Sequence, residues 1–410
     1  MKWKTCTIAD IGTVVGGATP STKKNENYEN GNIAWITPKD LAGFSGRFIS
    51  HGERNITEIG LKSCSTQMMP KHSVLFSSRA PIGYVAIANN ELCTNQGFKS
   101  VVPNENTDYM FLYYLLRYNK EKIENMGSGT TFKEVSGNTM RGIEVTVPES
   151  IEDQKKIASI LSTIDDKIER NEAIHKNLEQ QVQSIFQSWF IESSDRTTWE
   201  TGTLSDLIES TLSGDWGKES PSGKNTEMVY CIRGADIPEV KTGNKGKMPT
   251  RFILPKNYSA KHLVPGDIVV EISGGSPTQS TGRAAAISQS LLDRYDHGMV
   301  CTNFCKALKP ISGYSMFVYY YWQYLYDHNV FFSYENGTTG IKNLDISSVL
   351  TVEEISIPPF ELITSFDSIC QSIFDQTFAN GLENERLAIL RDTLLPKLMS
   401  GEIDVSDLSI

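Results

Sequence analysis

The sequence that decides the fold is IASILSTIDDKIERNEAIHKNLEQQVQSIFQSWF, Ile157–Phe190, together with FDSICQSIFDQTFANGLENERLAILRDTLLPKL, Phe366–Leu398. In both stretches, apolar side chains recur at alternating steps of four and three residues, a spacing that places them along one seam of a long helix. Both seams turn polar near the middle, which would fix the register of a helix pair. The residues expected to pair are Ile157, Leu161, Ile164, Ile168, Asn171, Leu178, Val182, Ile185 and Trp189 in the first helix, and Phe366, Ile373, Asn380, Leu387, Leu394 and Leu398 in the second.

The rest of the chain repeats with a period of roughly 200 residues. Single matches are weak, but they occur in the same order in both halves, and this order predicts two copies of one fold. The matched pairs are Thr7–Ile11 with Thr203–Leu207, Trp35–Thr37 with Cys231–Arg233, Cys93–Asn95 with Cys301–Asn303, Lys99 with Lys306, and Gly129–Thr131 with Gly337–Thr339.

Each copy consists of short runs of β-branched and aromatic residues separated by Gly, Pro, Asn and Ser, as expected for a strand-rich mixed module. We therefore predict an α+β chain in which two repeated α/β modules are joined by two long helices, paired as an antiparallel coiled coil with pseudo-two-fold symmetry. The expected segments are 1–148 for the first module, 149–192 for the central helix, 193–357 for the second module, and 358–410 for the C-terminal helix and tail. A dimerisation coiled coil between two chains is the alternative that the spacing leaves open.

Composition gives mixed indications about function. The chain has 410 residues, 39% hydrophobic and 21% charged, which favours a globular protein. A formal net charge of -10 argues against DNA as a partner unless the acidic residues gather away from a locally basic face. The sequence has no run of about 18 apolar residues, and its seven cysteines are scattered, so we expect a soluble, cytoplasmic protein without disulfides.

Four motifs resemble those of one known family. Gly16–Lys23 and Ile33–Leu41 are similar to the opening of a target-recognition domain from Type I restriction-modification specificity subunits. Leu178–Phe190 resembles the end of that family's central spacer helix, and Leu390–Ile403 resembles its C-terminal signature. The resemblance covers essentially the whole chain. The second module departs from the usual opening, because it has Ser213–Gly217 where the first has Gly-Gly-Ala-Thr-Pro.

The resemblance implies a division of labour between subunits. Each of two target-recognition domains would read one half of a split, asymmetric site in double-stranded DNA. The spacer helices would set the gap between half-sites and dock two methyltransferase subunits, and restriction subunits would join through those. S-adenosylmethionine, ATP and Mg would belong to the partners, so no cofactor and no metal is expected in this chain, and no membrane contact.

Motifs for catalysis were sought in the same sequence. A DNA methyltransferase would need an Asn or Asp before Pro-Pro-aromatic, whereas Ile357–Phe360 begins with an isoleucine that cannot hydrogen-bond a base. No phosphate-binding Gly-x-x-x-x-Gly-Lys-Ser/Thr loop occurs. A non-catalytic subunit is therefore expected. The competing hypotheses are a non-DNA scaffold that presents two protein-binding modules on a helical hairpin, favoured by the acidic charge, and a stand-alone methyltransferase.

Candidate DNA-binding residues were chosen from loops rich in Gly and in hydrogen-bonding or cationic side chains, since these groups read bases and hold phosphates. An ordinary polar turn is the alternative for any single one of them. The candidates are Thr19, Ser21, Lys23, Lys24, Ser78, Arg79, Asn95, Gln96, Lys99, Thr130, Thr131 and Lys133 in the first module, and Trp216, Lys218, Ser276, Thr278, Arg283, Asn303, Lys306, Thr338, Thr339 and Lys342 in the second.

Overall fold

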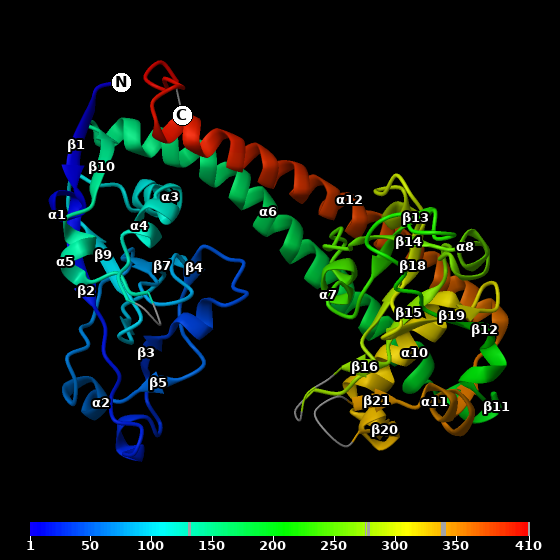
Figure 1. Cartoon of the computed structure of the whole chain (residues 1–410). Coiled ribbons are helices and arrows are strands. Elements are labelled where there is room, and N and C mark those ends of the chain that lie inside the picture. The colour runs from blue at the N-terminus through cyan, green and yellow to red at the C-terminus, as the bar shows by residue number, and fades with distance from the viewer. Residues whose placement is uncertain (130–132, 275, 277–278, 338–341, 409–410) are drawn as a thin grey trace. The chain divides into compact units, whose positions relative to one another are not determined.

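A computed structural model describes residues 1–129, 133–274, 276, 279–337 and 342–408 of the chain (Figure 1). It divides into two compact units: unit 1 is Met1–Glu169 with Leu387–Ile410, and unit 2 is Arg170–Arg386. Each unit therefore contains one predicted module and part of both long helices. The predicted segment boundaries, which separate modules from helices, remain a prediction.

The described residues of unit 1 form three sheets. The strands β1 (Trp3–Thr7) and β10 (Glu144–Pro148) pair antiparallel, so both ends of the module meet. A five-stranded sheet has the order β2 (Gly12–Gly16), β9 (Lys99–Pro103), β6 (Val74–Phe76), β7 (Val85–Ala88) and β4 (Phe48–Ile49). A three-stranded sheet has the order β5 (Asn55–Ile56), β3 (Ile33–Ile36) and β8 (Cys93–Thr94). The short helices are α1 (Ile8–Ile11), α2 (Glu58–Lys62), α3 (Tyr109–Tyr118), α4 (Lys120–Asn125) and α5 (Gly137–Arg141).

Unit 2 repeats this plan. The strands β11 (Glu200–Thr203) and β22 (Glu354–Ile357) pair antiparallel. The larger sheet has the order β12 (Ile208–Ser213), β19 (Cys305–Pro310), β15 (Ile268–Glu271) and β17 (Ala284–Ala286). Two three-stranded sheets follow, β14 (Thr250–Ile253), β13 (Glu227–Ile232), β18 (Met299–Cys301), and β16 (Ser273–Gly274), β21 (Lys342–Leu344), β20 (Glu335–Asn336). The helices are α7 (Ile237–Lys241), α8 (Pro255–Lys261), α9 (Gln289–Leu292), α10 (Ser315–Asp327) and α11 (Ile346–Val352).

Strand order and capping both confirm that the two modules share one fold. In strand order, β2-β9-β6-β7 corresponds to β12-β19-β15-β17, and β5-β3-β8 to β14-β13-β18. The backbone N–H of Thr7 donates to Asp10 at 2.7 Å, and that of Thr203 donates to Asp206 at the same distance. The same short polar signal therefore begins the first turn of both modules, because a carboxylate three residues on can accept from the N-cap amide.

An apolar helix fills the core of each module. In α3, Phe111–Leu116 are all buried, and the carboxylate of Asp108 caps the helix by accepting from Phe111 N at 2.8 Å. In α10, Trp322 is fully buried, and its indole N–H donates to Gly282 O at 2.7 Å. A helix that is apolar on most of its faces can lie only inside a domain, and this explains the aromatic runs seen in both halves of the sequence.

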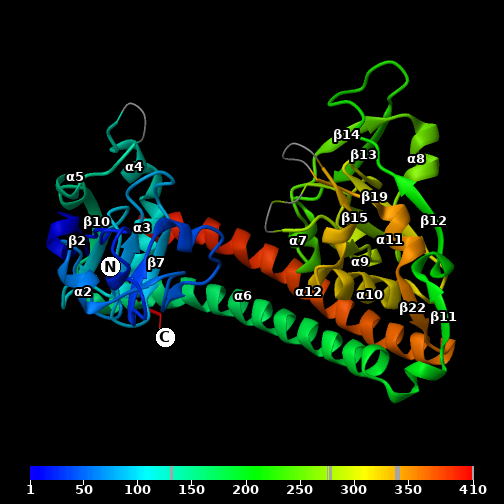
Figure 2. The same cartoon turned by 90° about the horizontal axis from the view of Figure 1, so that it is seen from below.

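The two long helices are α6 (Ile151–Phe186), extended by a π-helical turn at Gln187–Ile191, and α12 (Phe360–Met399). They lie side by side within each unit (Figure 1, Figure 2). In unit 1, Ile157 and Leu161 share a core cluster with Leu398. In unit 2, Val182 shares one with Phe366. The start of α6 thus packs on the end of α12, and its end packs on the start of α12, so the helices run antiparallel as predicted.

The middle of the helix pair is polar, as expected from its sequence. In unit 2, the side-chain amide of Asn171, which is 1% exposed, donates to Asn384 Oδ1 at 2.8 Å and to Glu383 Oε2 at 2.7 Å. His175 Nδ1 lies 3.4 Å from the Thr377 hydroxyl. All fifteen residues predicted to pair are buried or half-buried. Buried amides must find partners, and such directional pairs disfavour a slipped register.

Candidate DNA interface

In unit 1, the loops that carry Thr19 and Gln96 cross each other closely at Gly17. A Cβ atom on Gly17 would lie 2.1 Å from Asn95 O and 2.2 Å from Thr94 O, so only glycine fits there. The next residue, Ala18, donates its N–H to Thr94 O at 3.1 Å. The loop that follows β2 is therefore fixed directly against the loop that follows β8. Thr19 and Gln96, one on each loop, are hydrogen-bonded through their side chains.

Unit 2 contains the same crossing. A Cβ atom on Gly214 would lie 1.9 Å from Thr302 O, and Asp215 N donates to Cys301 O at 2.8 Å. Gly217 has φ +59°, and a Cβ there would lie 2.4 Å from Phe252 O, so this loop also needs glycine at a second position. The departure from Gly-Gly-Ala-Thr-Pro in the second module thus preserves the glycine that the crossing requires.

The strand register corrects one detail of the predicted repeat. Ile36 pairs with Thr94, whereas its counterpart Ile232 pairs with Cys301. The identical Cys-Thr-Asn triplets are therefore offset by one residue, so Gln96, rather than Asn95, corresponds to Asn303. Lys99 and Lys306 do correspond, because they pair with the equivalent residues Gly16 and Ser213.

The first-module candidates fall into a clustered set and an exposed set. Ser78 is fully buried, and its N–H donates to Gly97 O at 2.7 Å, which joins the loop after β6 to the loop after β8. Arg79 and Lys99 both contact Glu134, at 3.0 and 3.6 Å. Asn95 Oδ1 accepts from Gly97 N at 2.8 Å and so stabilises the turn. The exposed set is Ser21, Lys23, Lys24 and Lys133, while Thr130 and Thr131 lie outside the described residues.

In the second module, two candidate cations are held by carboxylates. Arg283 makes a two-point contact with Glu271, at 2.8 and 2.6 Å. Lys342 lies 2.8 Å from Glu335. Burial raises the pKa of Glu335, but hydrogen bonds from Lys342 and from Thr281 outweigh it, so the net pKa is lowered and the carboxylate stays charged. Both cations are thus fixed in direction before any ligand binds.

The remaining candidates of unit 2 differ in exposure. Trp216, Lys218 and Asn303 are exposed, whereas Ser276 and Lys306 are half-buried. Thr278, Thr338 and Thr339 lie outside the described residues. The structure also identifies a neighbour that the sequence prediction missed, Phe304, which follows Asn303 and is 61% exposed. The signal that could have found Phe304 is its place between Asn303 and Lys306, two candidates of the same loop.

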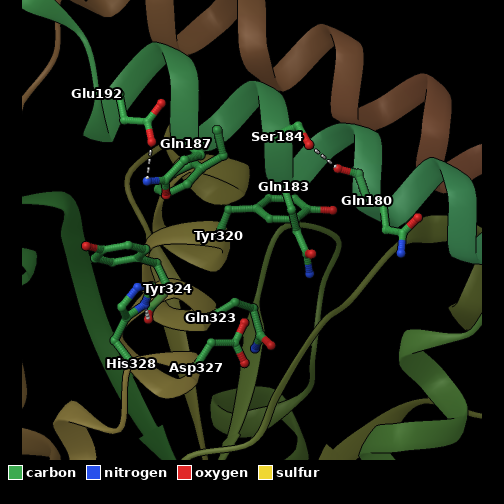
Figure 3. A pocket seen from close by; sticks show the side chains of 11 residues that line it. Gln180, Gln183, Ser184, Gln187, Glu192, Tyr320, Gln323, Tyr324, Asp327 and His328 are labelled. Carbon is green, nitrogen blue, oxygen red and sulfur yellow. Dashed lines mark hydrogen bonds between the residues drawn. The ribbon is translucent and has the colours of Figure 1, made fainter.

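A separate pocket lies against the long helix in unit 2. It has a volume of about 690 Å³ and lies between α6 and α10 (Figure 3). Gln180 and Gln183 line it from α6, and Tyr320 and Tyr324 line it from α10 (Figure 3). The Tyr320 hydroxyl donates to Glu179 at 3.4 Å. None of the candidate DNA-binding residues lines this pocket, so it belongs to the helix face of the unit.

The described part of the chain shows neither a metal-binding cluster nor a membrane-spanning helix. Within it, no group of three or more His, Cys, Asp or Glu side chains is placed to hold a metal ion. None of the helices that the structure describes is both long and apolar enough to cross a membrane.

Comparison with known proteins assigns the family. A family model of the Type I restriction modification DNA specificity domain matches residues 1–180. The chain is 34% identical over 442 residues to the Type I restriction enzyme MjaIX specificity subunit of Methanocaldococcus jannaschii, covering 99% of this chain and 94% of that protein. It is 22% identical to the Type I restriction enzyme HindI specificity subunit of Haemophilus influenzae, covering 98% and 99%.

A solved structure shows the same fold. It is the crystal structure of the S subunit of a Type I restriction-modification system from M. genitalium, with a TM-score of 0.59 and 16% identity, covering 97% of this chain and 96% of that one. The repeated modules, the paired helices and the extended sequence match therefore agree. The chain belongs to the family of Type I restriction enzyme specificity subunits, the non-catalytic subunits that carry DNA sequence recognition.

Proposed function

We propose that this chain specifies a split, asymmetric DNA site, of which each module reads one half. The observation that carries the proposal is that equivalent loops of the two units have the same backbone arrangement but carry different side chains. The crossings at Gly17 and Gly214 fix equivalent loops in the two units. Unit 1 presents Thr19 and Gln96 on these loops, whereas unit 2 presents Trp216 and Asn303. Two similar supports with different hydrogen-bonding groups select two different base sequences.

Within each module, we assign different tasks to the two sets of candidates. Side chains on the loops that the crossing fixes, such as Gln96 and Asn303, are suited to base edges, because amides can make two hydrogen bonds to adenine. Exposed lysines such as Lys23, Lys24 and Lys133 are suited to phosphates. Binding through phosphates releases counterions, so affinity for DNA falls steeply with salt.

The long helices set the number of unread base pairs between the half-sites. The 36 residues of α6 correspond to about 54 Å at 1.5 Å per residue, the length of roughly 16 base pairs. Both helices run through both units, so a change in their length changes the reach of the two modules together. The polar contacts of Asn171 support this role, since they oppose slippage of the pair.

Two methyltransferase subunits dock on the long helices, and restriction subunits join through them. Three large apolar side chains support this docking surface, because they face solvent: Ile174 on α6 is 45% exposed, and Ile389 and Leu390 on α12 are 62% and 47% exposed. S-adenosylmethionine, ATP and Mg bind to those partners. The partners also supply cationic surface that this chain, with a net charge of -10, has in short supply.

The experiment combines the chain with the methyltransferase subunit of its own system and methylates a random DNA library. Sequencing the methylated products should reveal one motif made of two short blocks with a constant gap. Changing Gln96 to Ala should relax one block and leave the other unchanged, and changing Asn303 to Ala should do the reverse. A complex that methylates no split motif, or variants that relax both blocks alike, would contradict the proposal.

A further inference from the structure

Unit 2 contains an aromatic pocket at its loop crossing. It has a volume of about 530 Å³ and is lined by Trp216, Arg233, Asn303 and Phe304, among others. Trp216 is 38% exposed and Phe304 is 61% exposed. Two exposed aromatic side chains that line one pocket form a shared apolar surface, and a ligand that covers it would remove considerable apolar area from water.

The equivalent place in unit 1 is occupied differently. Phe304 O accepts from Ile272 N at 2.9 Å, just as Gly97 O accepts from Ser78 N at 2.7 Å, so Phe304 and Gly97 are structural counterparts. Gly97 is buried, and a Cβ there would lie 2.7 Å from the ring of Pro38. The two modules thus have the same backbone hydrogen bond at this position and differ in the side chain that the loop carries there.

The residue two positions after the crossing glycine also differs between the two units. Trp216 stands two residues after its crossing glycine, where unit 1 has Thr19. Thr19 bonds to Gln96 and links the two loops of unit 1. Trp216 and Asn303, the corresponding pair, line the open pocket instead. The site is therefore specific to the second module.

The loops that carry the two aromatic residues are anchored by hydrogen bonds and by an arginine contact. The guanidinium of Arg251 lies over the Trp216 ring, 4.0 Å from its centroid, and contacts Glu219 at 3.1 Å. The neighbouring residue Lys218 exchanges two backbone hydrogen bonds with Phe252, both at 2.9 Å. The carbonyl of Phe304 accepts from two amides, Ile272 N at 2.9 Å and Ser273 N at 3.3 Å. Both aromatic residues are thus anchored by their loops without a bound ligand.

We propose that this pocket receives the 5-methyl group of a thymine in the half-site read by the second module, with Phe304 and Trp216 in contact with it. The proposal rests on the proposed DNA-reading function. The thymine methyl is the apolar group that base pairs present in the major groove, and aromatic contact with it is an established means of base discrimination. Asn303 stands beside Phe304 at the position of Gln96, so an apolar and a hydrogen-bonding contact fall on adjacent residues of one loop.

The test uses the assembled complex of this chain with its methyltransferase subunits and its own methylated motif. Each thymine of the motif is replaced in turn by deoxyuridine, which removes only the methyl group. One replacement, in one half-site, should weaken binding about three- to fivefold, the effect of about one buried methyl group. The complex that carries Phe304→Ala should bind the thymine and uracil duplexes with equal affinity. Phe360→Ala, at an exposed phenylalanine outside the pocket, should retain the preference for thymine.

Crosslinking supplies a direct readout. 5-Iododeoxyuridine at the sensitive thymine should crosslink under light to Phe304 or Trp216, as located by mass spectrometry. The proposal is overturned if no thymine is sensitive, if Phe304→Ala keeps the preference, or if the crosslink maps to unit 1. A complex that recognises its split motif but shows any of these results removes the pocket assignment alone. A complex that recognises no split motif removes the proposed function as well.

Discussion

Asp165 on α6 connects three parts of unit 1, and its removal should destabilise that unit strongly. The residue is 4% exposed. Its carboxylate accepts from the Tyr114 hydroxyl on α3 at 2.6 Å and from Arg391 on α12 at 2.8 Å, and lies 3.7 Å from Arg117. Burial raises the pKa of Tyr114, and the charge of Asp165 raises it further, so the phenol remains a donor.

The expected loss of stability follows from the side chains that Asp165→Ala deprives of a partner. The hydroxyl of the fully buried Tyr114 loses its acceptor, and Arg391, whose side chain is 16% exposed, loses its buried counter-charge and keeps only the exposed Asp392. Breaking one side of a buried ion pair costs about 3 to 5 kcal/mol. For a unit of about 190 residues, this corresponds to a fall in Tm of roughly 6 to 20 °C. Asp165→Asn keeps an acceptor and the side-chain volume, so its cost should be about 1 to 3 kcal/mol.

Hydrogen exchange measured by mass spectrometry separates the two units. Peptides from α3 should lose protection in Asp165→Ala, while peptides from α10 should not. Glu152→Ala, which removes an exposed carboxylate bonded to Lys155, is the matched control and should change protection by less than about 1 kcal/mol. A double-mutant cycle with Arg391→Met should give a coupling energy of about 0.5 to 3 kcal/mol. Unchanged protection of α3 in Asp165→Ala would refute the reasoning.

Three further predictions concern the helices, the crossing and pH. Inserting seven residues at facing positions of α6 and α12 should lengthen the unread gap by about three base pairs, as sequencing of methylated DNA will show; an unchanged gap would count against the helices as the ruler. Gly17→Ala should force apart the loops after β2 and β8 and relax one block of the motif, whereas Gly16→Ala, whose Cβ would meet nothing closer than 3.9 Å, should not. Burial lowers the pKa of His175 below its ordinary 6.5, so the unfolded chain takes up the proton more readily and unit 2 should lose stability as pH falls below about 6.5. Denaturant titrations at several pH values should show this loss, and His175→Asn should reduce it.

The helices and the repeat could be predicted because their signals are local or ordered along the chain. A seam such as Ile157, Leu161 and Ile164 has the period of a helix and needs no knowledge of distant residues. The polar middle of the seam, at Asn171, can be read from the sequence in the same way. The repeat was recognised from the order of its matches, and the glycines that now prove essential at the crossings were already part of the quoted motifs.

Register and long-range pairing could not be predicted in this way. The two Cys-Thr-Asn triplets are identical, yet their strands pair one residue out of step, because parallel pairing of β3 with β8 depends on contacts nearly 60 residues away. The partners of the candidate cations also lie outside the cations' own loops or strands: Glu134 lies far along the chain from Arg79, and Glu335 belongs to a different strand from Lys342. Solvent exposure could not be read from the sequence either, so Phe304, which is 61% exposed, was not among the candidates.

These carboxylates also explain how an acidic chain can serve as a DNA reader. In both modules, a candidate cation is held by an acid: Glu134 in the first, and Glu271 and Glu335 in the second. Such pairs fix the direction of a flexible side chain and partly cancel its charge. DNA phosphates must then displace or share the cation, so the chain gains little from indiscriminate phosphate attraction and more from groups that read bases. Under the proposed function, partner subunits also contribute affinity, and discrimination between base sequences comes from the loops of this chain.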